Sequence, residues 1–109
     1  MPIIDVSTLP TVIPPGAPPE FASPALETDD FVLAITEIPA GASGDMHTHP
    51  GDQVEWLWKG RGRITVEGDE PFEVEPGQVW HVPAGVRHTG EALTDCTVVA
   101  LILKGKVTS

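Results

Sequence analysis

Short apolar runs, alternating or continuous and separated by turns rich in glycine and proline, fill the chain from Phe31 onward. Runs of this length without a helical period predict β-strands. The expected strands cover residues 31–38, 45–49, 52–59, 63–67, 72–75, 78–82, a short stretch at His88, and 96–103. No segment shows convincing helical periodicity. The pattern therefore predicts an all-β, antiparallel sandwich or barrel.

The first 29 residues depart from this pattern. Within fifteen residues lie Pro10, Pro14, Pro15, Pro18, Pro19 and Pro24. This density argues against helix and central strand. We expect an extended Pro-rich N-terminal arm over 1–29, with one short edge strand at Ile3–Val6, and a barrel over 30–109. The arm either lies across its own barrel, reaches a partner subunit, or is a partly disordered tail.

The length and the net charge of the chain limit the number of domains and the kinds of molecule that it can bind. The 109 residues suffice for one domain. Six basic against sixteen acidic residues give a net charge of −10, so nucleic acid and anionic membrane surfaces are poor partners. The single Cys96 excludes an internal disulfide, which fits a reducing compartment. No basic leader and no membrane-length apolar run is present, so we expect a cytoplasmic protein.

Three histidines and a glutamine form a candidate metal site. His47 and His49 are two residues apart, so on a strand they point to the same face. The turn at Pro50-Gly51-Asp52 returns Gln53 beside them, and a second stretch brings His88. Three imidazoles and an amide oxygen suit one divalent transition metal (Fe, Mn, Ni, Co, Cu or Zn) rather than calcium or magnesium.

The spacing of these residues resembles two signatures of the cupin superfamily. The first is Gly41-x5-His47-x-His49-x3-Gln53-x6-Gly60, and the second is Gly77-x5-Pro83-x-Gly85-x2-His88. The resemblance, to small single-domain bacterial cupins, implies a double-stranded β-helix, or jelly roll, with the metal inside and frequent dimerisation. Two positions depart from the pattern. Gln53 stands where the family has a metal-binding Glu, and Ala92 where an Asn often closes the second signature.

The presence of Gln53 in place of the family's Glu changes the charge of the site. A Glu would leave a divalent site at a formal charge of +1, whereas neutral Gln53 with three neutral imidazoles leaves +2. Such a site is a stronger Lewis acid and favours an anionic partner such as a carboxylate or enolate. The alternative is that Gln53 is a non-ligating residue of the barrel interior and the site is weak or vacant.

The strand that begins near Gln53 carries the candidate acid or base. If Gln53 faces the metal, Glu55 shares its face. A carboxylate beside a metal in a closed barrel is costly unless it is paired or used. Glu55 is therefore the candidate general acid/base. Alternatively it forms an ion pair with Arg63 or points to the barrel mouth.

Trp56 and Trp58 face the other way, where either the arm or a second subunit should cover them. We therefore expect a homodimer. Arg87 could hold a substrate carboxylate at the barrel mouth or be an ordinary surface residue. His81 could serve substrate binding or proton transfer from the barrel interior, or be a hydrogen-bonded structural histidine.

Two classes of function fit these residues. The first is an enzyme acting on a small oxygenated molecule, a carboxylate or an enolisable carbonyl compound. Its reaction would be a dioxygen-dependent cleavage or a redox-neutral isomerase or lyase step. The second is a non-catalytic module that binds a metal or a small ligand. The neutral ligand set and Glu55 favour the enzyme.

Overall fold

The structure is a computed structural model, and it describes residues 3–105. Two short 3-10 helices and nine strands form in this range. In chain order they are η1 (Val6–Thr8), β1 (Thr11–Val12), η2 (Pro19–Phe21), β2 (Ser23–Glu27), β3 (Phe31–Ile38), β4 (Gln53–Lys59), β5 (Gly62–Val66), β6 (Phe72–Val74), β7 (Val79–Val82), β8 (His88–Ala92) and β9 (Cys96–Leu103). None of the described helices is long and apolar enough to cross a membrane.

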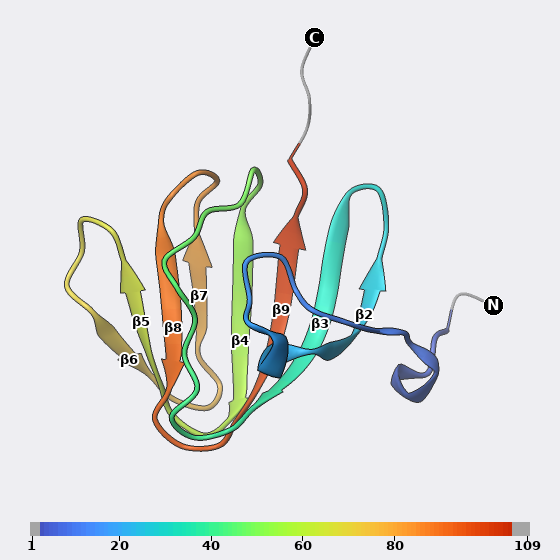
Figure 1. The fold of residues 1–109 in the computed structure, drawn as a ribbon, viewed down its shortest axis with the longest axis horizontal. Coiled ribbons are helices and arrows are strands. Elements are labelled where there is room, and N and C mark those ends of the chain that lie inside the picture. Colours follow the sequence, from blue (N-terminus) through green and yellow to red (C-terminus); the bar gives the residue numbers. More distant parts are fainter. Residues whose placement is uncertain (1–2, 106–109) are drawn as a thin grey trace, which may run out of the picture.

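The strands form two antiparallel sheets that enclose the interior (Figure 1). The larger sheet has the order β1-β2-β3-β9-β4-β7 and the smaller one β6-β5-β8. The longest pairing in the larger sheet joins β3 and β9, from Phe31 opposite Leu103 to Ile38 opposite Cys96. This all-β, antiparallel jelly-roll architecture confirms the predicted fold class.

The predicted strand at 45–49 does not form. The chain that leads into β4 pairs with β8 through two isolated bridges, Ser43 opposite Glu91 and His47 opposite His88, and not through a strand. Three residues separate the bridges on one side and two on the other, so a continuous ladder cannot be kept between them. The prediction was therefore wrong about the strand, and His47 is positioned by a single bridge.

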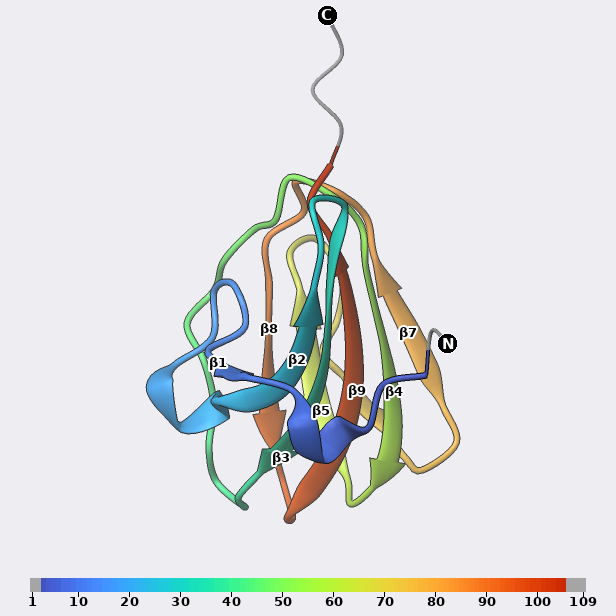
Figure 2. The same cartoon turned by 90° about the vertical axis from the view of Figure 1, so that its right-hand side faces the viewer.

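The arm follows its own barrel for most of its length. No strand forms at Ile3–Val6, contrary to expectation, and Val6–Thr8 is a 3-10 helix. Ser23–Glu27 instead joins the sheet as β2, although it contains Pro24. The proline is tolerated because β2 pairs with β3 through the residues after it, Ala25 to Glu27. The larger sheet thus begins before residue 30. The later part of the blue arm, around residues 14–21, lies beside the green segment that leads into β4 (Figures 1 and 2).

The core lies between the sheets. Its main cluster is built around fully buried Leu57 and Val82, with Trp80 and Val98 packed beside them. Along β3 the residues Val32, Ala34 and Thr36 are buried, as the two-residue period requires. The strands of the two sheets therefore surround the interior of the barrel.

Candidate metal centre

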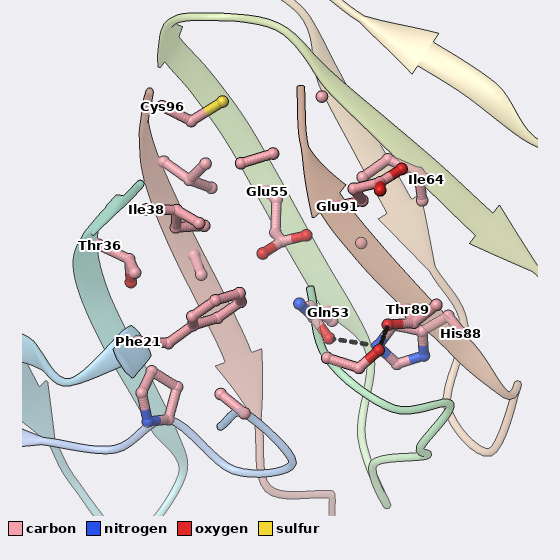
Figure 3. A pocket seen from close by; sticks show the side chains of 18 of the residues that line it. Phe21, Thr36, Ile38, Gln53, Glu55, Ile64, His88, Thr89, Glu91 and Cys96 are labelled. Carbon is pink, nitrogen blue, oxygen red and sulfur yellow. Dashed lines mark hydrogen bonds between the residues drawn. The ribbon is translucent and has the colours of Figure 1, made fainter. Parts of the chain in front are cut away.

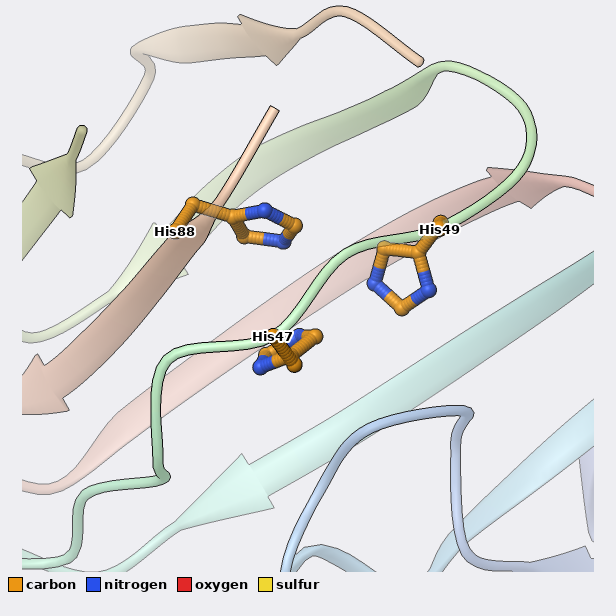
Figure 4. Close-up of side chains that lie close together, drawn as sticks. All are labelled: His47, His49 and His88. Carbon is orange, nitrogen blue, oxygen red and sulfur yellow. The ribbon is translucent and has the colours of Figure 1, made fainter. Parts of the chain in front are cut away.

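His47 and His88 are held opposite each other by the backbone. Each donates its N–H to the carbonyl of the other, with both N···O distances at 3.0 Å. His49 lies further along the same segment, where its carbonyl accepts a hydrogen bond from the Gly85 N–H at 2.9 Å. The rings of His47 and His49 meet face to edge and the His88 ring is tilted toward both, and each imidazole offers a nitrogen within 4.8 Å of the others (Figure 4). They form a group able to hold a metal ion.

Backbone carbonyls fix which nitrogen is free in the His47 and His88 rings. Nδ1 of His47 lies 2.8 Å from the Asp45 carbonyl oxygen, and Nδ1 of His88 lies 2.9 Å from that of Val86. A carbonyl oxygen only accepts, so each Nδ1 carries the proton and each neutral ring presents an Nε2 lone pair. Metal-binding histidines are commonly oriented in this way.

His49 supplies an independent sign of a missing partner. Its ring is buried, and its Nε2 has no hydrogen-bond partner in the part of the chain that the structure describes. Leaving a buried polar atom unpaired costs about 1–3 kcal/mol. A metal ion among the three rings would remove that cost.

Gln53 reaches the histidines from the larger sheet. Its side chain is buried, and its Oε1 lies 2.8 Å from Nε2 of His88 (Figure 3). Since the His88 proton is on Nδ1, two lone-pair atoms face each other. The amide nitrogen of Gln53 lies on the side of Glu55 (Figure 3).

Burial keeps two of the imidazoles neutral. Desolvation, reinforced by the neighbouring His47 and His88 rings, lowers the pKa of His49 to about 4. Desolvation likewise lowers the pKa of His88. Neutral imidazole is the form that binds metal, so the residues present fit a divalent transition metal in donor type, tautomer and protonation.

A cavity of about 100 Å³ continues from the histidines into the barrel. Its lining is largely apolar and includes Leu57, Ile64 and Val98. Glu55 extends into it from β4, two residues after Gln53 (Figure 3). The predicted alternation along β4 is confirmed, because Leu57 is buried while Trp56 and Trp58 are 47% and 48% exposed.

The Glu55 carboxyl exchanges between its neutral and its charged form near neutral pH. Desolvation raises the pKa of Glu55, and the nearby polar groups of Gln53 and Trp80 offset part of this rise, which leaves the pKa at about 7. Glu55 makes no ion pair within the described residues, since Arg63 pairs with Glu91 at 3.5 Å instead. Trp80 stands directly opposite Glu55 on β7, and its buried indole N–H has no hydrogen-bond partner among residues 3–105.

Two residues suggested for substrate binding lie elsewhere. His81 is on the outer face of β7, where its Nε2 lies 2.9 Å from Asp52 Oδ2. Arg87 is exposed and pairs with Glu67 at 3.4 Å. Neither lines the cavity. His81 therefore braces the start of β4, the structural role that the sequence had left open, and neither side chain is retained in the site.

The arm contributes residues that the sequence did not indicate. Part of the cavity wall comes from Pro14, Pro15, Ala17, Pro18 and Phe21. Gly16, within this stretch, lies against the His47 ring. The only signal for this segment was its proline content, which predicts stiffness but not the surface on which it packs.

Comparisons with known proteins agree with this geometry. Residues 34–104 match the family model described as the cupin domain, and the chain belongs to that family. The resemblance inferred from the two histidine signatures is thereby confirmed. An uncharacterized protein of Streptomyces coelicolor is 35% identical over 63 residues, which are 58% of this chain and 59% of that protein. The match thus spans less than two thirds of that relative.

Solved structures share the architecture. An RmlC-like cupin from Shewanella frigidimarina is similar with a TM-score of 0.75 at 18% identity, over 92% of this chain and 87% of that one. KdgF from a Halomonas species gives a TM-score of 0.71 at 25% identity, over 82% of this chain and 84% of that one. The first likeness shows the fold alone.

Proposed function

We propose that the chain is a metal-dependent enzyme that moves a proton on a small oxygenated substrate, either a carboxylate or an enolisable carbonyl compound, in a redox-neutral isomerase or lyase reaction. The observation that carries the proposal is the adjacency of two features. The lone pairs of His88 Nε2 and Gln53 Oε1 face each other, and the carboxyl of Glu55 stands beside them in a small apolar cavity. Ligand set and proton carrier thus share one enclosed space.

Different side chains would bind the metal ion and exclude water from the substrate. His47, His49, His88 and Gln53 would hold one divalent ion, which when bound supplies Lewis-acid stabilisation to a negative oxygen of the substrate. The four neutral ligands leave the full +2 charge, which favours an anionic substrate oxygen. The apolar lining around Leu57 and Val98 keeps water away from that oxygen.

Glu55 would carry the proton. As carboxylate it accepts a proton from the carbon next to the carbonyl group; the electron pair of the broken C–H bond forms a C=C bond, and the π pair of the C=O bond moves to the oxygen. As carboxylic acid it returns the proton to a neighbouring carbon. A pKa near 7 lets one group serve both directions at neutral pH.

The test is proton exchange. Metal-loaded protein in D₂O should incorporate deuterium next to the carbonyl of small keto acids, followed by NMR. Glu55→Gln should slow the exchange by about 10²-fold or more while retaining metal. Equal exchange rates in wild type and Glu55→Gln would remove Glu55 from this role.

A dioxygen-dependent cleavage is the second candidate, because three imidazoles and an amide also suit iron. It is distinguished by oxygen uptake in place of deuterium incorporation. If a metal-loaded protein shows neither, the chain is a non-catalytic binding module.

A further inference from the structure

The Pro-rich arm is part of the site. The segment Pro14–Phe21, here called the proline wall, supplies five of the residues that line the cavity. It lies beside the histidine-bearing segment in both views of the fold (Figures 1 and 2). At Gly16 the contact is so close that a Cβ atom would overlap the ring of His47. A ligand that occupies the cavity therefore meets the proline wall.

The wall is rigidly built. Pro14 to Ala17 form a turn closed by a hydrogen bond of 3.0 Å from the Ala17 N–H to the Pro14 carbonyl. Pro15 and Gly16 occupy the two central positions of this turn. The φ angle of Gly16 is +80°, as the third position of a type II turn requires. The 3-10 helix η2 follows directly. Little conformational freedom is left, so the wall limits the space in front of it.

Phe21 is the largest side chain that the wall presents to the cavity. Its ring points inward on the side away from His88 and Thr89 (Figure 3). Its backbone carbonyl accepts a hydrogen bond from the fully buried Ser23 hydroxyl, which lies 2.7 Å from the Thr36 hydroxyl on β3. The position of Phe21 is therefore tied to the barrel and not to the arm alone.

We propose that the proline wall determines the specificity of the site and that Phe21 sets the length of the apolar part of the ligand. The inference rests on the proposed function for one point, the anionic oxygen bound at the histidines. The ligand class that fits is a short-chain carboxylate whose hydrocarbon part fills the cavity between Leu57 and Phe21. Longer chains are rejected because the Phe21 ring blocks them.

The experiment is calorimetric titration of metal-loaded protein with straight-chain carboxylates: acetate, butanoate, hexanoate and octanoate. Wild-type affinity should rise about fourfold for each methylene that becomes buried and then fall for longer chains. Phe21→Ala removes the ring and should move the optimum to a chain at least two carbons longer. Phe72→Ala is the matched control, because Phe72 is exposed on β6 and does not line the cavity.

A second series separates this inference from the metal. Straight-chain alcohols, titrated into metal-free protein and followed by NMR shifts, need no anion site and should show the same change of optimum in Phe21→Ala. If Phe21→Ala fails to fold, Phe21→Leu should give a smaller change in the same direction. An optimum identical in wild type and a folded Phe21 variant would overturn the proposal. So would a wild type that binds neither series. Loss of metal binding alone, with the alcohol result intact, would refute only the metal chemistry.

Discussion

Gly16 of the arm lies against the imidazole of His47, and no side chain fits between them. The two residues are 31 positions apart in the sequence, yet the contact links the outer wall of the cavity to one of the three histidines. The arm is thus in a position to hold the His47 ring in place.

The variant Gly16→Ala tests this link. The added methyl group should displace either the arm or the His47 ring and weaken metal affinity by roughly tenfold, measured by competition with a chelator. Gly16 has a positive φ, which alone makes alanine unfavourable. Gly68→Ala is the control, since Gly68 has φ +92° and nothing within reach of a Cβ. If both variants bind metal as wild type does, the contact does not support the site.

The neutral side chain of Gln53 should govern the affinity for anions. Gln53→Glu is expected to retain metal and to reduce the charge of the site from +2 to +1. Formate binding to the metal-loaded variant should then weaken by roughly tenfold relative to wild type, measured by calorimetry. Equal formate affinity would indicate that Gln53 is not a ligand.

Glu55 should make stability depend on pH in a defined direction. Its pKa is about 7 in the folded protein against 4.5 as the ordinary value, so the folded state holds the proton more tightly. The stabilisation that this proton gives the folded state is fully present below pH 4.5 and is lost as the pH rises through 7. In metal-free protein, Glu55→Gln should therefore gain stability relative to wild type between pH 4.5 and 8, by at most about 3 kcal/mol.

Urea unfolding at several pH values measures this difference. The contribution of His49 cancels because it is present in both proteins. Glu37→Gln, which removes an exposed carboxylate on β3, is the control for net charge. A stability difference that stays constant with pH would show that Glu55 titrates normally.

The exposed apolar side chains on the outer face of the larger sheet lead us to predict a homodimer. Trp56 lies between Val99 and Val79 on the neighbouring strands, and Val79 is 59% exposed. The described part of the arm leaves both tryptophans about half exposed. A second copy is the occupant we expect, since apolar residues line this face along β3, β9 and β4.

Sedimentation measurements test the dimer. The double variant Trp56→Ser, Trp58→Ser should raise the dimer dissociation constant by at least about 10²-fold. Phe72→Ser, on the smaller sheet, should leave it unchanged. A wild-type protein that is monomeric at high concentration would contradict the prediction.

Local patterns along the sequence were enough to predict which residues gather at the candidate metal centre. The two-residue period of β4 correctly put Glu55 and Leu57 inside and Trp56 outside. The histidine spacing predicted a group that comes together in the fold, with Gln53 beside it. These features depend on short-range periodicity and on turns, both of which are encoded within a few residues.

The remaining features depend on long-range packing. Whether His81 or Trp80 faced the interior could not be decided locally, because Val79 is apolar yet exposed. The contact of Gly16 with His47 and the inward ring of Phe21 depend on the path of the arm, which prolines make stiff but do not direct. The pairing of Arg63 with Glu91, which leaves Glu55 alone, follows from the β5–β8 register.

The most direct test is the metal content of protein purified anaerobically, measured by elemental analysis. Wild type should carry roughly one divalent transition-metal ion per chain, and His49→Ala and His88→Ala less than about a tenth of that. His81→Ala should match wild type, because His81 lies on the outer face beside Asp52. Full metal content in His88→Ala, or a wild type that binds no transition metal when it is supplied, would contradict the account.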